Sequence, residues 1–291
     1  MSKYGYQNGI QKYKCASCGK VFQGGKRLIP SELWLAYIEG KQTYKQLSIK
    51  YNCSIKTIQR KIDSYVPPTN SVFVSVANIL MDTTYFGRKL GVMVFKDSLS
   101  KKILYKRYVK YETNQQYHEG IIEISRRGIL VQSIVCDGRK GLLQLFEGIP
   151  IQMCQFHQVQ IVNRYLTRKP KMPAAIELRL LTLNLTKTSK ALFTERLFQW
   201  QNKWEDFLKE RTIHPDTGKS YYTHKRLRSA WRSLRRNIPW LFVYEDYQEL
   251  MIHNTTNALD GVFSDLKNKL RNHNGLSMQR KKRLIDGFFE A

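Results

Sequence analysis

The order of apolar and amphipathic stretches after residue 70 constrains the fold more than any other feature of the chain. Apolar runs typical of strands lie at 71–87 and at 90–112, and the turn segment "KDSLSKK" divides the second run into two strands. The chain then predicts a helix at 114–128, a strand followed by a turn and a helix at 129–146, and a short strand leading into a helix at 149–166. From 72 to about 165 the order is therefore strand, strand, strand, helix, strand, helix, strand, helix. This order predicts an α/β fold with a mixed sheet and helices on both faces.

Two aspartates follow apolar strands of this predicted sheet. Asp82 comes after "ILM", and Asp137 comes after "IVC". A turn after the strand would explain either aspartate alone, although burying an unpaired carboxylate is costly. Ligand sites of open sheets lie at strand ends, and two carboxylates brought together there repel each other unless a cation lies between them. Such oxygen ligands suit Mg²⁺ or Mn²⁺, and a pair of these metals can promote phosphodiester cleavage.

The charge of the chain indicates a polyanionic partner. Lys and Arg number 49 against 23 Asp and Glu, which gives a formal net charge of +26. The basic residues are spread along the chain with Tyr and Trp between them, which favours double-stranded DNA over a membrane surface. A ribosomal or other generic basic protein is the alternative. No apolar run reaches the roughly 18 residues of a membrane span, so we expect a cytoplasmic, nucleoid-associated protein.

Residues 31–63 predict a small helical element. Apolar residues at helical spacing predict a first helix that Gly40 ends, and Thr43 and Ser54 can cap two more helices. Two short helices joined by a tight turn are typical of a helix-turn-helix, whose second helix enters the major groove. An ordinary helical bundle is the alternative. The side chains that would face DNA are Lys56, Thr57, Gln59 and Arg60.

The five cysteines do not predict a disulfide framework, because their number is odd and the expected compartment is reducing. Cys15 and Cys18 form a C-x-x-C knuckle with basic and aromatic neighbours, as in a zinc ribbon. A structural zinc site needs four ligands, and no second C-x-x-C precedes this one. A vestigial knuckle is therefore favoured over a zinc site.

Four segments together resemble DDE transposases of bacterial insertion sequences, in the Mutator-like (MULE) group. The segments are "MDTTYFG", "VCDGRKG", "CQFHQVQIV" and "TTNALDGVFSDLKNKLRNHNGLS". The resemblance implies an RNase H-like catalytic core with an all-helical insertion between its last strand and its final acidic helix. It also implies Mg²⁺- or Mn²⁺-dependent strand cleavage and transfer at the ends of the element. Such enzymes work on paired DNA ends, so we expect a homo-oligomer on element ends and target DNA.

The resemblance maps Asp82 and Asp137 onto the first two acidic positions of the family. The third position is usually a glutamate within "N-x-x-E-G", and here the matching segment Asn257–Gly261 carries Asp260. Aspartate is one methylene shorter, which moves its carboxylate back by roughly 1.5 Å. Asp265 and Glu249 are rival third ligands without the motif around them.

Cys154 and His157 match the C-x-x-H element that this group carries after its second aspartate. Their spacing places both side chains on one face of a helical turn. They could be two ligands of a metal. A packing cysteine and a hydrogen-bonding histidine that support the site are the favoured alternative.

The pattern divides the chain into five segments. Residues 1–27 form the partial zinc-ribbon-like knuckle, 28–66 the helix-turn-helix, and 67–165 the first part of the core. Residues 166–250 form the helical insertion, and 251–291 contain the acidic helix and a basic C-terminal segment. Two clusters of these later segments are expected to bind DNA phosphates: Arg228, Arg232 and Arg235 in the insertion, and Lys267, Lys269 and Arg271 after the acidic helix.

The sequence thus predicts a DNA transposase that cleaves and joins DNA at insertion-sequence ends. A DNA-binding protein with a degenerate, inactive core is the first alternative, and the shorter Asp260 side chain favours it. An RNase H-like nuclease that cleaves without joining is the second alternative.

Overall fold

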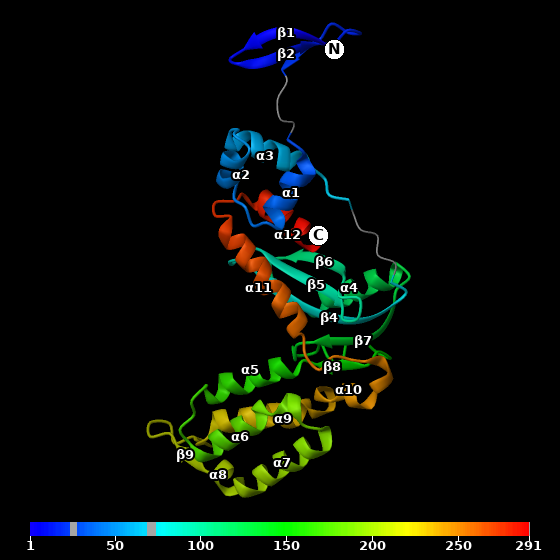
Figure 1. The fold of residues 1–291 in the computed structure, drawn as a ribbon. Coiled ribbons are helices and arrows are strands. Elements are labelled where there is room, and N and C mark those ends of the chain that lie inside the picture. Colours follow the sequence, from blue (N-terminus) through cyan, green and yellow to red (C-terminus); the bar gives the residue numbers. More distant parts are fainter. Residues whose placement is uncertain (24–27, 69–73, 291) are drawn as a thin grey trace. The chain divides into compact units, whose positions relative to one another are not determined.

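The computed structural model describes residues 1–23, 28–68 and 74–290 (Figure 1). The chain forms two compact units. The terminal unit contains residues 1–70 and 266–291, and the central unit contains residues 71–265. The first residues of the predicted strand at 71–87, and the end of the proline-containing linker, lie outside the described residues. Among the described helices, none is long and apolar enough to cross a membrane.

The described part of the central unit is built on a five-stranded mixed sheet with the strand order β6-β5-β4-β7-β8. Strand β4 pairs antiparallel with β5, and β5 with β6, whereas β4 with β7 and β7 with β8 are parallel. The predicted α/β fold with a mixed sheet flanked by helices is confirmed. The strands are β4 (Val76–Tyr85), β5 (Gly91–Asp97), β6 (Ile103–Val109), β7 (Leu130–Cys136) and β8 (Ile151–Met153).

Helix α4 (Asn114–Arg126) connects β6 to β7 and packs on the sheet. Thr113 begins this helix with a capping box, because its hydroxyl accepts from Gln116 N and the Gln116 side chain accepts from Thr113 N. The approach of helix to sheet is close at Gly120, where an added Cβ would lie 2.1 Å from Cζ of the buried Phe95 ring. A glycine is therefore needed for this contact.

The remaining helices of the central unit follow β8. Helices α5 and α9 pack against each other, and a buried polar chain joins them: Asn237 Nδ2 donates to Gln158 Oε1 at 2.7 Å, and Gln158 Nε2 donates to Ser233 Oγ at 3.0 Å. The helices are α5 (Gln155–Leu166), α6 (Pro173–Leu183), α7 (Lys190–Lys203), α8 (Glu205–Lys209), α9 (Lys225–Leu241) and α10 (Val243–Asp246), with 3-10 turns at Leu185–Lys187 and Gln248–Leu250.

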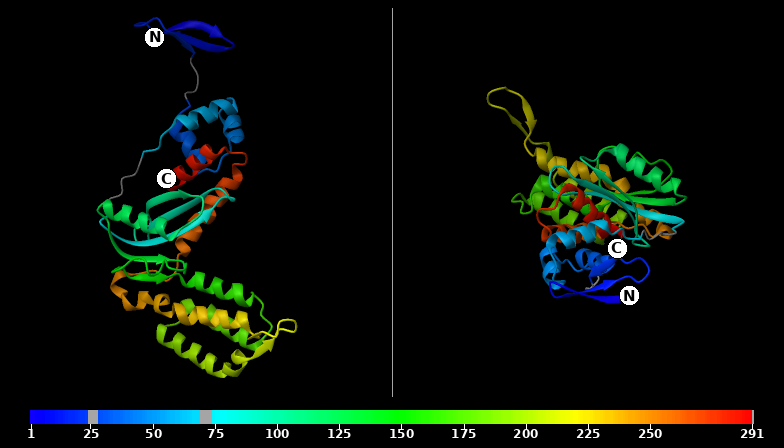
Figure 2. Two further views of the ribbon diagram at one scale, coloured as in Figure 1. Left: turned by 180° about the vertical axis from the view of Figure 1, so that it is seen from behind. Right: turned by 90° about the horizontal axis from the view of Figure 1, so that it is seen from above.

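Two expectations for the central unit are wrong. Residues 166–250 are not all helical, because β9 (Arg211–Ile213) and β10 (Ser220–Tyr222) form a hairpin that stands out from the helices (Figure 2). The turn residues of "HPDTG" explain it, since Gly218 has a positive φ of 62°. The helix predicted between Asp137 and β8 is also absent. Gly141 and Gly148 have φ of 80° and 74°, and the chain between them forms turns.

The terminal unit begins with three antiparallel strands, β1 (Ser2–Gln7), β2 (Ile10–Lys14) and β3 (Val21–Gln23). Its helices α1 (Pro30–Ile38), α2 (Tyr44–Lys50) and α3 (Ile55–Ser64) lie where the sequence predicts helices. Thr43 caps α2 with a capping box, and the Ser54 hydroxyl caps α3 by accepting from Thr57 N. Both predicted caps are confirmed.

Helix α11 (Asn257–Asn272) runs from the central unit into the terminal unit, and α12 (Met278–Glu290) belongs to the terminal unit. Helix α12 packs on α1, where an added Cβ at Gly287 would lie 2.2 Å from Trp34 Cζ2. The Arg283 guanidinium lies 5.3 Å from the Trp34 ring centroid and donates to Tyr65 O. The C-terminal segment therefore completes the unit that contains α1 to α3.

The close approach of α4 predicts that Gly120→Ala destabilises the central unit. The buried Phe95 ring would have to move, at a cost of about 1–3 kcal/mol. Thermal unfolding followed by circular dichroism should show a lower Tm. The control is Gly261→Ala, whose Cβ meets nothing within 4 Å in α11, so it should leave the Tm unchanged or raise it slightly. Equal melting of Gly120→Ala and the parent would contradict this packing.

Candidate functional site

The register between β4 and β7 brings Asp82 beside Asp137. Leu80 pairs with Val135 in the parallel ladder, so two residues further along each strand Asp82 faces Asp137. Neighbouring strands lie about 5 Å apart, and both side chains point to the same face because both follow the paired residues by two. The sequence placed Asp82 at the end of its strand, which is wrong: β4 continues to Tyr85 because β5 still pairs with it there.

Asp82 lies on the face of the sheet opposite α4. Ile79 and Met81 belong to the apolar core that includes α4, and Asp82 alternates with them. One carboxylate oxygen of each aspartate is held by a backbone donor. Asp82 Oδ1 accepts from Thr83 N at 2.7 Å, and Asp137 Oδ1 accepts from Arg139 N at 3.1 Å.

Asp260 reaches this face from the first turn of α11. The start of α5 ties the segment before α11 to the end of β7. Cys154 N donates to Cys136 O at 2.8 Å, and Cys154 Sγ accepts from both the N–H and the hydroxyl of Thr256, each at 3.3 Å. Gln155 N also donates to Asn254 O at 2.9 Å. Cys154 therefore links the strand that leads to Asp137 with the helix that carries Asp260.

We call Asp82, Asp137 and Asp260 the acidic cluster. Burial raises the pKa of Asp82 from 3.8 to about 7, and the negative charges of Asp260 and Asp137 add to the rise. The charge of His157 and the hydrogen bond from Thr83 N oppose it. Asp260 Oδ2 is buried and has no hydrogen-bond partner among the described residues. The three carboxylates are thus close enough to interact and incompletely satisfied by the protein.

His157, in the first turn of α5, supplies positive charge beside the cluster. Burial lowers its pKa, but the hydrogen bond with the Cys154 side chain and the charges of Cys154, Asp82 and Asp137 outweigh burial and raise the pKa to about 9. Burial raises the pKa of Cys154, whereas the hydrogen bonds from His157 and Thr256 lower it overall. These interactions favour the protonated form of His157, although its Nδ1 is buried and has no hydrogen-bond partner among the described residues.

The donor set of the acidic cluster fits a hard divalent cation. Carboxylate oxygens are the ligands that Mg²⁺ and Mn²⁺ prefer, and a cation would relieve the repulsion that raises the Asp82 pKa. The described residues nevertheless contain no group of three or more His, Cys, Asp or Glu side chains close enough to hold one metal ion.

The rival third ligands are placed less favourably than Asp260. Glu249 lies on an exposed 3-10 turn. Asp265 is five residues after Asp260 on α11, which turns its side chain to another face of the helix. Asp260 is the carboxylate of these three whose charge acts on Asp82.

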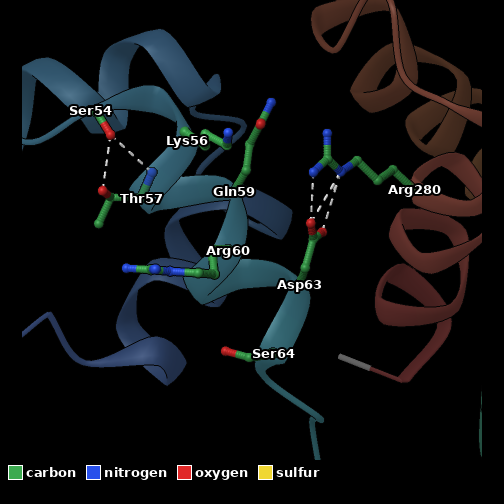
Figure 3. Close-up of a pocket in the computed structure, with 8 residues that line it drawn as sticks. All are labelled: Ser54, Lys56, Thr57, Gln59, Arg60, Asp63, Ser64 and Arg280. Carbon is green, nitrogen blue, oxygen red and sulfur yellow. Dashed lines mark hydrogen bonds and ion pairs between the residues drawn. The ribbon is translucent and has the colours of Figure 1, made fainter.

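In the terminal unit, the side chains predicted to contact DNA line a groove of about 600 Å³ along α3 (Figure 3). Lys56 and Arg60 are exposed, whereas Gln59 and Thr57 are half-buried. The Thr57 hydroxyl is hydrogen-bonded to Ser54 Oγ at 2.9 Å. The α3 surface thus carries two exposed cationic side chains, with the polar side chains of Thr57 and Gln59 half-buried between them.

Asp63 and Arg280 close one end of this groove (Figure 3). Arg280 Nη2 donates to Asp63 Oδ2 at 2.7 Å, and its Nε donates to the same carboxylate. Asp63 is the acidic residue among those that line the groove, and Arg280 neutralises its charge. The surface around Lys56 and Arg60 therefore stays positive. Sequence reasoning missed the pair, because 217 positions separate its members.

The other predicted DNA contacts differ in exposure. Arg232 and Arg235 are exposed on α9 and Arg271 is exposed on α11, whereas Lys267 is half-buried.

Two of the predicted DNA contacts are already engaged within the protein. The Arg228 guanidinium donates to Leu208 O and lies 3.5 Å from the Tyr222 ring centroid. Lys269 is 9% exposed and lies 4.7 Å from the Phe288 ring centroid. A phosphate contact would require Lys269 to leave that position.

The knuckle at Cys15 and Cys18 is a hydrogen-bonded turn, in which Gly19 N donates to Cys15 O at 3.0 Å. A hydrogen bond with the Ser17 side chain, aided by backbone donors, lowers the pKa of the Cys15 thiol to about 6. The turn supplies two thiols, and the described residues bring no further ligands to them.

No protein-family model matches the chain, and no curated protein matches its sequence. Among solved structures, the chain is similar to a chain of the simian T-cell lymphotropic virus intasome in complex with PP2A regulatory subunit B56 gamma. The two share 11% identity with a TM-score of 0.24, over 71% of this chain and 66% of the other. A similarity at this level carries no argument about fold or function.

The raised pKa of Asp82 predicts a pH-dependent stability difference. The folded state holds the Asp82 proton more tightly than the unfolded chain, so the parent loses stability as pH rises from about 4 to about 7. Asp82→Asn removes this loss. At pH 8 its free energy of unfolding should exceed that of the parent by on the order of 1–3 kcal/mol, and it should unfold at a higher temperature. At pH 4 the two should be similar.

Asp216→Asn is the control, because the Asp216 side chain is 86% exposed. It should show no such difference at either pH. If Asp82→Asn were no more stable than the parent at pH 8, the buried acidic cluster described above would be wrong.

Proposed function

We propose that this protein is a DNA transposase that cleaves and transfers DNA strands at the ends of an insertion sequence. The observation that carries the proposal is the parallel register that sets Asp82 beside Asp137, with the charge of Asp260 acting on Asp82. A mixed sheet of three antiparallel strands extended by two parallel strands is compatible with the RNase H-like core of such enzymes. The net charge of +26 supports a nucleic-acid substrate.

Asp82, Asp137 and Asp260 would hold the divalent cations. When bound, Mg²⁺ or Mn²⁺ activates the attacking oxygen and stabilises the leaving oxygen of a phosphodiester. The protein's own contribution is to bring the three carboxylates close enough for their charges to interact. His157 adds a positive charge at neutral pH, where it can neutralise part of the cluster before the cations and the DNA bind.

The terminal unit would bind double-stranded DNA as a helix-turn-helix. Helix α3 carries Lys56 and Arg60 on its exposed surface, and the groove beside them is positive. In the central unit, Arg232 and Arg235 on α9 would contact the backbone of the same or a second duplex. Strand transfer requires two ends in one assembly, so the active form would be a homo-oligomer on DNA.

One alternative is a DNA-binding protein with a degenerate core. Two observations favour it: Asp260 is shorter than the family's glutamate, and the described residues do not gather three ligands within reach of one metal. A nuclease that cleaves without joining would use the same cluster. The products of the reaction distinguish these functions, because only a transposase joins the cleaved end to target DNA.

The test is a cleavage assay with purified protein, Mg²⁺ or Mn²⁺, and a linear DNA that carries the gene with its native flanking sequence. The parent should cut at the element ends and join them to a target plasmid. Asp82→Ala and Asp137→Ala should abolish cleavage while DNA binding stays nearly intact, because affinity comes mainly from Lys and Arg on phosphates. Asp260→Ala should fail equally.

Asp260→Glu separates the transposase from the degenerate core. A raised rate means that the short side chain limits an active site, and a lowered rate means that the site has adapted to aspartate. If neither the parent nor Asp260→Glu cleaves DNA with Mg²⁺ or Mn²⁺, the degenerate, DNA-binding core becomes the favoured function. Cleavage by Asp260→Ala, together with its loss in Asp265→Ala or Glu249→Ala, would show that Asp260 is misassigned.

DNA binding by α3 gives a separate prediction. Lys56→Ala combined with Arg60→Ala should weaken binding to duplex DNA and reduce the salt slope of log affinity by about 1–2. The matched control is Lys203→Ala with Lys209→Ala, since each of these lysines is exposed and already paired with a glutamate. Equal affinities and slopes for both double variants would exclude α3 as a DNA-contacting helix.

A further inference from the structure

We propose that Tyr117, Glu112 and Arg139 are positioning residues that fix the separation of the Asp82 and Asp137 carboxylates. This inference rests on the proposed function, in which the two aspartates share divalent cations. Hydrogen bonds among these three side chains and the Thr83 hydroxyl join the two residues whose backbone N–H groups donate to the aspartates: Thr83 donates to Asp82, and Arg139 donates to Asp137. None of the three is expected to touch metal or DNA.

The first half of the chain crosses strand β4. Thr83 follows Asp82, so its side chain points to the opposite face of the sheet, toward α4. Its N–H donates to Asp82 Oδ1 at 2.7 Å, and its hydroxyl is hydrogen-bonded to Tyr117 OH at 2.8 Å. Tyr117 is 2% exposed in the middle of the α4 contact. Tyr117 on α4 therefore holds the side chain of the residue whose N–H donates to Asp82.

The second half runs from α4 to the loop that carries Asp137. Tyr117 OH donates to Glu112 Oε2 at 3.1 Å, and Arg139 Nη1 donates to Glu112 Oε1 at 3.0 Å. Arg139 N, in turn, donates to Asp137 Oδ1 at 3.1 Å. Glu112 thus uses one oxygen for the Asp82 side and the other for the Asp137 side.

Arg139 is fully engaged within the central unit. Its Nη2 donates to Glu112 O at 3.0 Å and its Nε donates to Asn114 Oδ1 at 2.9 Å, so each guanidinium nitrogen has a partner. Asn114 Nδ2 also donates to Lys140 O at 2.9 Å. The loop after Asp137 is therefore clamped to the start of α4. An arginine held in this way fixes the loop and is not placed to bind phosphate.

Fixing this loop matters for the position of Asp137. The charge of Asp137 helps to raise the pKa of Asp82, so the two carboxylates repel each other, and without a constraint the loop with Asp137 would move away from β4. Ligand oxygens must lie within a few tenths of an ångström of the required positions, and the side chains behind them set their orientation. The chain from Thr83 to Arg139 joins the two ligands across the face that carries no metal.

The test measures Mn²⁺ affinity by electron paramagnetic resonance of the free Mn²⁺ signal, on the full-length protein. Tyr117→Phe, which removes only the hydroxyl, and Glu112→Gln, which weakens the bond to Arg139, should each lower Mn²⁺ affinity about tenfold. The Mg²⁺ concentration for half-maximal cleavage should rise by a similar factor. Thr83→Ser keeps the hydroxyl and should bind Mn²⁺ like the parent.

Two controls separate positioning from general stability. Tyr105→Phe removes a hydroxyl from a tyrosine that also packs on Phe95, and Glu123→Gln breaks the exposed pair with Arg127 on α4. Both should bind Mn²⁺ like the parent. Tyr117→Phe with Glu112→Gln should lose less than the sum of the two single losses, because both break one chain.

The outcomes distinguish this inference from the proposed function. If Asp82→Asn lowers Mn²⁺ affinity but Tyr117→Phe and Glu112→Gln do not, the positioning role is wrong and the metal site stands. If the controls lose affinity as much as the test variants, the effect is general stability and the positioning role is again wrong. If the parent has no Mn²⁺ site that depends on Asp82, the proposed metal site fails and this inference fails with it.

Discussion

The parallel pairing of β4 with β7 is the constraint on which the rest of the central unit depends. Parallel strands end at the same edge of a sheet, so two aspartates that follow matching paired residues must become neighbours. The connection between the strands contains β5, β6 and α4, and α4 returns Tyr117 to the back of β4. The same crossover therefore places Asp82 beside Asp137 and brings Tyr117 to the Thr83 hydroxyl, as the proposed positioning role requires.

Burial and neighbouring negative charge disfavour the ionised form of Asp82, which is consistent with the proposed metal site. Asp82 is an ionisable group in a buried place, near two further carboxylates, and burial is the largest cause of its raised pKa. Natural proteins retain such destabilising groups where function needs them. Cys154 connects the parts that carry Asp137 and Asp260, and His157 counters their charge. The C-x-x-H element thus supports the cluster through hydrogen bonds and charge.

Local patterns in the sequence predicted the local features of the structure. The order of the sheet's strands along the chain and the caps at Thr43 and Ser54 depend on neighbouring residues. The links between distant segments were not predictable, because Asp63 with Arg280 and Glu112 with Arg139 meet only after the chain has packed. The predictions for two short segments were also wrong. The strands of the β9–β10 hairpin have too few residues for a recognisable strand pattern. The segment "GLLQLF" buries its apolar side chains in turns instead of a helix.

We propose that Asp82, Asp137 and Asp260 form one divalent-cation site. Anomalous X-ray scattering from crystals of the protein bound to DNA and Mn²⁺ tests this claim most directly. We expect manganese peaks within ligand distance of Asp82 and Asp137, with an Asp260 oxygen in the coordination sphere of at least one ion. Manganese bound only elsewhere, or absent from the acidic cluster in a DNA complex that holds Mn²⁺, would contradict it.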